Sequence, residues 1–390
     1  MSLRDCGRHR ASTLIVLAWA LTGCGGGGGD GNPAAAVPPS AAAVPAGPAV
    51  PVWTLQRETA AHVGSTQVNV NAILDHIFTD QAVQVAMLVK LGFVIGERYA
   101  TSYSANDFVT TWSVAKSFYS AAIGVAIDEG WITSLDQKAS DFLTEWQGTV
   151  RADITIRNML EMRAGLPGGA DVLYETDQTA YSLNRDPLFA PGATFLYSNV
   201  TSQLFEPLLL RATGLSAHAY LRQKILAPIG IDTTQIGLWF DPTGVNPMTY
   251  CCIDMRPDDF ARFGLLYARG GQWDGVQVVS SAYVNESLAP QSDYYGFQWW
   301  VFNEILFGGP VPIVVSAAVG FDGQHIYVWP DEDVVLVVFT RYEHFQNQGY
   351  VFSAANLPNT CVGRNSCADS IGPEVPSYNQ LQLLNLLSNL

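Results

Sequence analysis

The chain has 390 residues, of which 48% are hydrophobic and 11% aromatic, so it can bury a sizeable core in one large domain. Its formal net charge of −15 argues against nucleic-acid binding, which needs basic patches that face phosphate. The acidic balance favours an exported protein.

The N-terminus is predicted to be a targeting segment. Three arginines precede an apolar stretch, residues 11–21, that is short for a membrane span, and the following Leu-Thr-Gly-Cys resembles a bacterial lipobox ending at Cys24. We expect residues 1–23 to be removed and Cys24 to carry the lipid anchor. An ordinary secretory signal with an incidental cysteine is the alternative. The anchor places the protein in the bacterial cell envelope, and Gly25 favours the outer membrane.

The segment after Cys24 is predicted to be a tether. It consists mainly of Gly, Ala and Pro and carries almost no charge, so it buries nothing. We therefore predict a tether over 24–51 and a folded domain over 52–390.

The apolar pattern of that domain predicts its helices and strands. We expect a hairpin over 83–97, followed by helices over 113–129, 154–162, 201–213, 217–225 and 257–269. Strands are expected over 295–301, 323–329 and 334–340, and a last helix over 378–390. This order predicts an α/β (α+β) fold, an antiparallel sheet flanked by helices with an inserted helical subdomain.

Ser113 and Lys116 open the strongest predicted helix as Ser-Val-Ala-Lys. Residues three apart at a helix start lie one turn apart on one face, so the lysine can reach the serine hydroxyl. The helix N-terminus stabilises an oxyanion, and the lysine can take part in removing the serine proton. This is the S-x-x-K arrangement of penicillin-recognising serine enzymes.

Five further stretches follow this motif in the order typical of one superfamily: 154–166, 190–199, 227–231, 257–264 and 320–324. The chain resembles the β-lactamase-like serine hydrolases over residues 80–345. This group includes class C β-lactamases, D-alanyl-D-alanine peptidases, family VIII carboxylesterases and 6-aminohexanoate-dimer hydrolases. The resemblance implies the β-lactamase/transpeptidase-like fold.

The resemblance also implies a Tyr-x-Asn motif, for which the chain has two candidates. Tyr197 and Asn199 follow a Pro-Gly turn in the predicted helical insertion, whereas the Tyr-Val-Asn at Tyr283 lacks that context. We therefore assign the motif to Tyr197 and Asn199 and interpret Tyr283 as a core or surface residue.

By the same resemblance, Tyr197 and Lys116 share the general-base work on Ser113. A nearby lysine ammonium makes a phenol easier to ionise, so Tyr197 is expected to lose its proton readily. Asn199 is expected to donate a hydrogen bond to Lys116 or to a substrate carbonyl.

The third motif departs from the family pattern. Where members carry Lys-Thr-Gly or His-x-Gly, this chain has Ala318-Val319-Gly320. Gly320 and Phe321 are expected at a strand edge beside the substrate, with the Phe321 N–H as an oxyanion donor together with that of the serine. The alanine removes the cation that recognises a substrate carboxylate. His325 and Arg341 could replace it, but both are interpreted as solvent-facing residues of a strand edge.

Four cysteines remain after the predicted signal and anchor, and an even number favours disulfides in an oxidising compartment. We favour Cys361–Cys367, which closes a small polar loop. Cys251 and Cys252 are adjacent, where a bond is strained, so their pairing with the later two stays open. Zinc binding is the weaker alternative because no histidine lies at ligand spacing, and no metal site is predicted.

Three other aromatic residues receive no role in catalysis. Trp299 and Trp300 are interpreted as core and rim rather than as a ligand platform. Tyr250, just before the cysteine pair, is left outside the predicted site, with a place in the pocket lining as its alternative.

These observations together predict a lipid-anchored serine hydrolase that cleaves carboxylic esters or linear amides, including aminohexanoate-type oligomers, without a cofactor. Its predicted partners are the small substrate and, through the anchor, the membrane; the oligomeric state is left open. A β-lactamase or D-Ala-D-Ala carboxypeptidase is the alternative enzyme, against which Ala318 argues. A non-catalytic envelope binding module is the alternative of another class, against which the retained serine, lysine, tyrosine and asparagine argue.

Overall fold

The computed structural model describes residues 53–342, 344, 351–352, 374–375 and 377–390. The predictions for the signal peptide, the tether and Cys24, and those for Cys361 and Cys367, lie outside these residues. In the part of the chain that is described, no helix has both the length and the apolar character that crossing a membrane requires.

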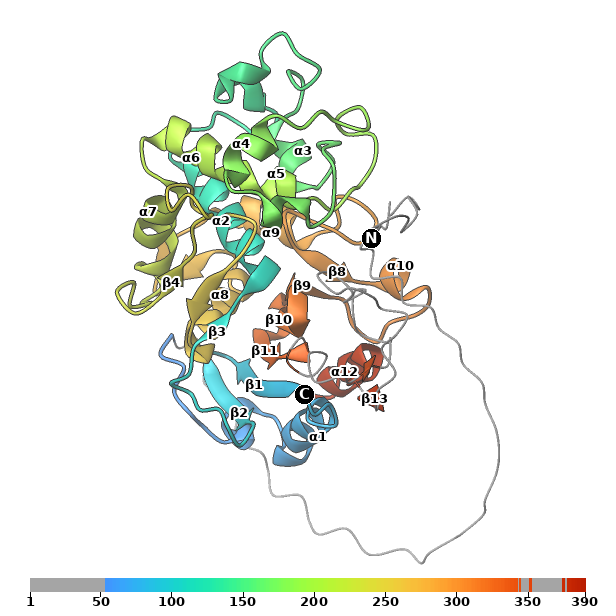
Figure 1. Cartoon of the computed structure of the whole chain (residues 1–390). Helices are drawn as coiled ribbons and strands as arrows, with labels where there is room; N and C mark the ends of the chain where they lie inside the picture. The colour runs from blue at the N-terminus through green and yellow to red at the C-terminus, as the bar shows by residue number, and fades with distance from the viewer. Residues whose placement is uncertain (1–52, 343, 345–350, 353–373, 376) are drawn as a thin grey trace, which may run out of the picture.

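A six-stranded antiparallel sheet forms the framework (Figure 1), in the strand order β2-β1-β11-β10-β9-β8. Its strands are β1 (Val83–Lys90), β2 (Phe93–Tyr99), β8 (Trp300–Phe302), β9 (Val315–Gly320), β10 (Gln324–Trp329) and β11 (Val334–Thr340). The predicted fold class is confirmed, and the hairpin and the last two strands lie where the sequence places them.

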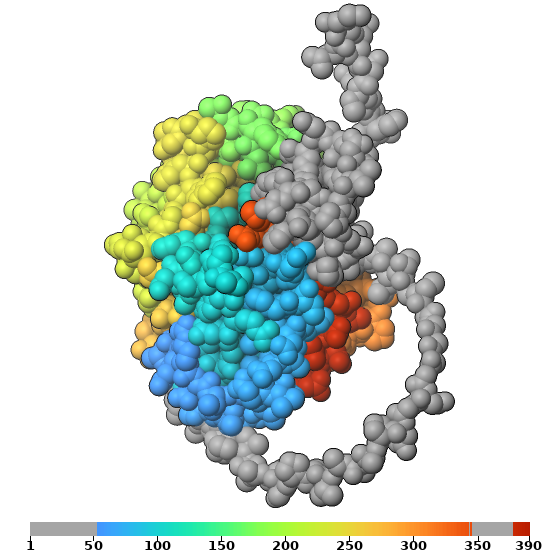
Figure 2. Space-filling model, turned by 60° about the horizontal axis from the view of Figure 1, so that its bottom comes forward, coloured from blue at the N-terminus to red at the C-terminus, as the bar shows by residue number. Residues whose placement is uncertain are grey.

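Helices cover both faces of this sheet. On one face α8 (Pro257–Ala268) packs against β1, β10 and β11, and on the other α1 (Gln67–Ile77) packs against β1 and β2 and against α12 (Gln380–Leu387). Figure 2 shows the first and last parts of the described chain, in blue and red, side by side on one face. Because successive strand residues point to opposite faces, a strand covered on both sides is buried throughout, as β11 is, and all of its residues except Thr340 are apolar.

One glycine sets the distance between α8 and the sheet. A Cβ at Gly264 would collide with the side chains of Val335 and Ile326. The helix can therefore lie close to β10 and β11 only because this position has no side chain.

A helical insertion joins β2 to β8, the two opposite edges of the sheet. Besides α8, the chain between β2 and β8 contains β3 (Val109–Thr110), α2 (Ala115–Asp128), α3 (Ile156–Leu160), α4 (Gln178–Leu183), α5 (Asn199–Gln203), α6 (Phe205–Thr213), α7 (Ala217–Leu221), β4 (Gly237–Leu238), β5 (Ile253–Met255), β6 (Gln272–Trp273), β7 (Val276–Gln277) and α9 (Ser281–Leu288). The short elements after β8 are α10 (Glu304–Phe307), β12 (Val351–Phe352) and β13 (Glu374–Val375). Figure 1 shows α3, α4, α5 and α6 gathered at the end of the molecule away from α1 and α12.

Several predicted elements are shorter than expected. The helix predicted over 201–213 divides at Leu204 into α5 and α6, and the strand predicted over 295–301 begins only at Trp300. The cause in the second case is Gln298, whose backbone has a φ of 64° and whose side chain donates to Leu160 O at 2.8 Å. The chain is thereby held to the end of α3 before it enters the sheet.

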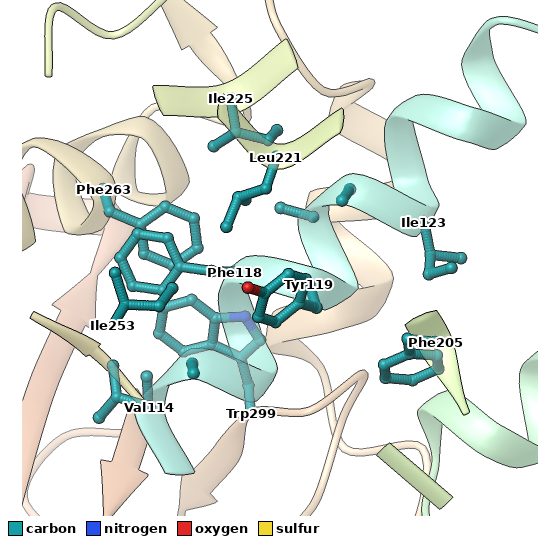
Figure 3. Packing of buried hydrophobic residues seen from close by; sticks show 14 of the residues in the cluster. Val114, Phe118, Tyr119, Ile123, Phe205, Leu221, Ile225, Ile253, Phe263 and Trp299 are labelled. Carbon is teal, nitrogen blue, oxygen red and sulfur yellow. The ribbon is translucent and has the colours of Figure 1, made fainter. Parts of the chain in front are cut away.

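Helix α2 lies in the centre of the apolar core (Figure 3), and its residues from Ala115 to Ala126 are buried. Phe118 stacks on Phe263 of α8 with ring centroids 3.6 Å apart, and the Trp299 ring lies nearly parallel to that of Phe263, with centroids 6.0 Å apart. Packing on every side fixes the first turn of α2, directly after the predicted nucleophile Ser113.

Candidate active site

Ser113 lies in a 3₁₀ turn, Trp112–Val114, that leads directly into α2; we call it the serine turn. Trp112 has a φ of 46°, a conformation that residues with a Cβ seldom adopt. On the preceding side, Thr111 N donates to Ile253 O at 2.9 Å and Thr111 Oγ1 accepts from Ile253 N at 2.7 Å. The surrounding structure therefore holds the turn in a conformation that the chain alone would not favour.

Lys116 reaches the serine as the spacing predicts. Its Nζ donates to Ser113 Oγ at 2.8 Å and to Tyr250 O at 2.7 Å, and the residue is only 1% exposed. Burial disfavours the charged amine and holds the pKa of Lys116 well below its usual value. A neutral amine in contact with a serine hydroxyl is able to accept its proton.

Tyr197 contacts both members of this pair. Its hydroxyl hydrogen-bonds with Ser113, and its ring centroid lies 5.1 Å from Lys116 Nζ. Burial raises the pKa of Tyr197 above its usual value, against a smaller lowering by the Ser113 hydrogen bond. The expectation of an easily ionised phenol is therefore wrong, because desolvation outweighs the neighbouring groups. Tyr197 keeps its proton and is suited to passing protons rather than to initiating the reaction.

Asn199 begins α5, and its amide does not donate to Lys116, which was one of the two expected partners. Its Nδ2 donates to Gly169 O at 3.0 Å, while its Oδ1 is buried without a partner in the described part of the chain. Ser198 caps α5 by accepting from Thr201 N at 3.0 Å and so fixes where the asparagine starts. Although Asn199 is only two residues from Tyr197 in sequence, its side chain makes no hydrogen bond with the lysine.

The end of β9 comes to the serine turn as predicted. A Cβ at Gly320 would collide with Thr111 O and crowd Trp112, so only glycine allows this approach. Phe321 follows at the end of the strand, and its ring meets Trp112 edge to face at 5.1 Å. Ala318 is buried, and its methyl group supplies no cation.

Residues 81–250 of the chain match the family model described as Beta-lactamase. The 6-aminohexanoate-dimer hydrolase of Paenarthrobacter ureafaciens is 25% identical over 291 residues, which cover 64% of this chain and 70% of that protein. The chain belongs to the β-lactamase/transpeptidase-like serine hydrolase family.

Solved structures share the fold of this family member at low identity. A penicillin-binding protein homolog from Caulobacter crescentus matches with a TM-score of 0.56 and 17% identity, over 70% of this chain and 91% of the other. A D-stereospecific amidohydrolase from Streptomyces matches with a TM-score of 0.53 and 18% identity, over 70% and 94%. At these identities the likeness concerns the fold.

Sequence reasoning left Tyr250 outside the predicted site, yet the structure of this hydrolase places it against Lys116. Tyr250 is 2% exposed, its carbonyl accepts from Lys116, and its ring centroid lies 5.6 Å from Lys116 Nζ. A backbone carbonyl leaves no signal in the side-chain pattern. Its position just before a Cys-Cys pair was the only available indication.

Trp300 is the second residue whose contact was not foreseen. Trp299 is fully buried and Trp300 is 5% exposed, in agreement with their interpretation as core and rim. However, Trp300 also stacks on Tyr197 with centroids 5.7 Å apart and on Tyr294 at 6.0 Å. It therefore supports the predicted acid/base residue from the side of the sheet.

The structure corrects the interpretation of His325. The residue does not face solvent but is 4% exposed in β10, where Nδ1 pairs with Gly323 O at 2.9 Å. Burial lowers the pKa of His325 to about 4, so it supplies no cation in place of the missing one. Tyr283 is a core residue, as expected, and donates to Ser120 O at 2.7 Å.

Cys251 and Cys252 form a disulfide with each other. The open alternative, in which they pair with the two later cysteines, is therefore wrong for this structure. Among the residues that it describes, no three His, Cys, Asp or Glu side chains gather as a metal site requires.

Proposed function

We propose that this hydrolase cleaves carboxylic esters or linear, uncharged amides through an acyl-enzyme on Ser113. The observation that carries the proposal is the 2.8 Å contact between Lys116 Nζ and Ser113 Oγ, made by a buried lysine whose pKa is lowered. A serine hydroxyl is a weak nucleophile until a base takes its proton, and a neutral amine at this distance is such a base.

In the first step, Ser113 Oγ bonds to the substrate carbonyl carbon while its proton moves to Lys116 Nζ. The oxyanion faces the N–H groups that the family resemblance assigns, those of Ser113 and Phe321. The bond from carbonyl carbon to the leaving oxygen or nitrogen then breaks, and the alcohol or amine departs with the proton from Lys116, passed by Tyr197. In the second step, water attacks the carbonyl carbon of the acyl-enzyme ester. The water proton passes by the same groups to Ser113 Oγ as the bond from that oxygen to the acyl carbon breaks, which releases the carboxylic acid and restores Ser113.

Two observations support the substrate class. Ala318 offers no positive charge to a substrate carboxylate at the third motif, which favours uncharged substrates over β-lactams and D-Ala-D-Ala peptides. The relative from Paenarthrobacter, named for a dimer of 6-aminohexanoate, indicates that linear amides should be tested beside esters.

The test is hydrolysis of p-nitrophenyl butyrate and of the linear 6-aminohexanoate dimer by the wild type and by Ser113→Ala, with a fluorophosphonate to label the nucleophile. We expect turnover and labelling by the wild type alone. Faster turnover of a chromogenic cephalosporin than of either substrate would instead favour the β-lactamase alternative. Absence of both turnover and labelling would overturn the enzyme proposal and favour a binding module.

We further propose that Cys24 carries a lipid that anchors the protein in the cell envelope, with the outer membrane favoured. The lipobox-like sequence and the uncharged segment after it support this proposal. Metabolic labelling with a fatty-acid analogue should mark the wild type and leave Cys24→Ser unmarked. A Cys24→Ser protein that still carries the label and stays in the membrane fraction would contradict it.

A further inference from the structure

The segment of residues 250–253 contacts the chain on both sides of the serine turn. At its first residue, Tyr250 O accepts from Lys116 Nζ at 2.7 Å. At its last, Ile253 exchanges two hydrogen bonds with Thr111, at 2.7 and 2.9 Å, and Figure 3 shows its side chain in the apolar cluster around α2. Thr111 and Lys116 flank the turn in sequence, so this single segment holds both of its ends.

The Tyr250 carbonyl determines how the lysine faces the serine. A carbonyl oxygen can only accept, so Lys116 points an N–H at Tyr250 whether the amine is charged or neutral. In the neutral amine this leaves the lone pair free to take the Ser113 proton at 2.8 Å. The direction of proton transfer therefore depends on where one backbone carbonyl lies.

The two residues between these anchors are the disulfide-linked cysteines. Cys251 and Cys252 are 3% and 1% exposed, and Cys252 has a φ of 85°, in the region that side chains with a Cβ disfavour. A bond between neighbouring side chains closes a small ring around their shared peptide and restricts its rotation. Without the ring, the backbone of Cys252 would relax toward negative φ. Because Ile253 is held by Thr111, this relaxation would displace the Tyr250 carbonyl on the other side of the ring.

We propose that the Cys251–Cys252 disulfide is a positioning element for the acylation step: it fixes the backbone of residues 250–253 so that Tyr250 O orients Lys116 toward Ser113. The inference rests on the proposed function. It assigns the cysteines no contact with substrate; they act through the carbonyl that precedes them.

Neighbouring contacts fix the Tyr250 side chain separately from its carbonyl. Its hydroxyl donates to Gln178 Oε1 at 2.9 Å, and the residue before it, Thr249, donates to Ser202 O at 2.7 Å. The loop is thus tied to α4 and α5 up to residue 250, and the disulfide fixes the backbone beyond that residue. Removal of the disulfide should accordingly move the carbonyl and leave the loop in place.

Two double variants separate the disulfide from the conformation that it holds. Cys251→Ala/Cys252→Ala removes the bond and keeps a Cβ at position 252, which disfavours the φ of 85°. Cys251→Ala/Cys252→Gly also removes the bond, but glycine accepts that φ without penalty. The second variant is the matched control, because it has the same missing sulfurs and retains access to the native backbone.

The measurement is the rate of fluorophosphonate labelling of Ser113 across pH, with the thermal midpoint of each variant recorded beside it. We expect the Ala/Ala variant to label about 100-fold more slowly, the cost of a misplacement near 1 Å, and the Ala/Gly variant to recover most of that loss. The phenols of Tyr197 and Tyr250 face Lys116 and stay protonated, since burial raises the pKa of both. The pH midpoint of labelling therefore reports on the lysine. It should move upward in the Ala/Ala variant as water reaches the amine, and a loss of folded protein alone would not move it.

Three results would overturn the inference. The first is an Ala/Ala variant that labels at the wild-type rate with the wild-type pH midpoint. The second is an Ala/Gly variant no faster than Ala/Ala at equal folded fraction. The third is mass spectrometry of the wild type that finds the peptide with both cysteines in the dithiol form. Each of these leaves the proposed function intact, whereas absence of labelling in the wild type would overturn the proposed function and this inference with it.

Discussion

The centre of the sheet and the serine turn lie in one molecule but are held together in different ways. Strand β11 has seven buried residues, and Leu336 at its middle pairs with Leu88 of β1 in a regular antiparallel ladder. The serine turn has Trp112 at positive φ, and the residues that flank it, Thr111 and Lys116, make hydrogen bonds to residues more than a hundred positions away. The sheet depends on apolar volume, which many side chains supply, whereas the turn depends on particular atoms.

This difference indicates where stability and activity separate. A smaller apolar residue in the sheet should cost stability and leave the chemistry of each folded molecule unchanged. A change beside Ser113 should cost activity with little loss of stability, because strained conformations and buried polar groups are maintained by the rest of the fold. Four substitutions test the comparison.

The largest expected effect is that of Lys116→Met. Loss of the general base should slow acylation by about 10³-fold. The thermal midpoint should stay the same or rise, because an apolar thioether replaces a buried amine. The control is Lys138→Met, an exposed lysine paired with Asp153, which should alter neither quantity. Near-wild-type labelling by Lys116→Met would show that another group takes the proton.

Next is Leu336→Ala in the centre of β11. A cavity in a core buried on both faces should lower the free energy of unfolding by about 3 kcal/mol, measured by urea denaturation. Turnover per folded molecule should not change. Val276→Ala, at a position 63% exposed, is the control and should cost less than about 0.5 kcal/mol. Equal losses in both variants would mean that the sheet is not the stable part of the fold.

Gly320→Ala tests where the two regions meet. The φ of Gly320 is −118°, which alanine accepts, so the cost comes from the collision of its Cβ with Thr111 O. Displacement of the serine turn should slow acylation by about 100-fold, which corresponds to about 2.7 kcal/mol. Gly309→Ala, where a Cβ meets nothing within 4 Å, is the matched control. Wild-type activity in Gly320→Ala would mean that β9 does not constrain the turn.

The smallest expected effect is that of Glu206→Gln, and it depends on pH. Glu206 is buried and accepts from Ala217 N at 2.8 Å, and burial raises its pKa to about 7 from an ordinary value of 4.5. The folded state therefore binds a proton that the unfolded state has lost, so the carboxyl lowers stability as pH rises from 4.5 to 7. Glutamine avoids this loss and can still accept from Ala217.

We expect Glu206→Gln to match the wild type in stability at pH 4 and to exceed it by on the order of 2 kcal/mol at pH 8. Urea denaturation of both proteins at the two pH values gives the difference, which isolates Glu206 from other titrating groups. A constant difference across pH would mean that the carboxyl does not change its proton affinity on folding.

The sequence by itself determined the parts of this protein that depend on local pattern. Apolar runs located α2, α8, β10 and β11, and helix spacing placed Lys116 one turn from Ser113. The ordered motifs indicated the family that the comparisons show. The lipid anchor and the assignment of catalytic roles stay predictions. Patterning failed for α1 and α9, which the sequence analysis did not name, and for the strand that Gln298 shortens.

Only the tertiary structure decided which atoms meet around the serine. The Tyr250 carbonyl, the stacking of Trp300 on Tyr197 and the burial of His325 all come from residues distant in sequence. Desolvation, which reversed the expected pKa shift of Tyr197, is likewise a property of the packed environment. A spacing fixes the distance between neighbours on one helix, but a contact across the fold depends on how every intervening element packs.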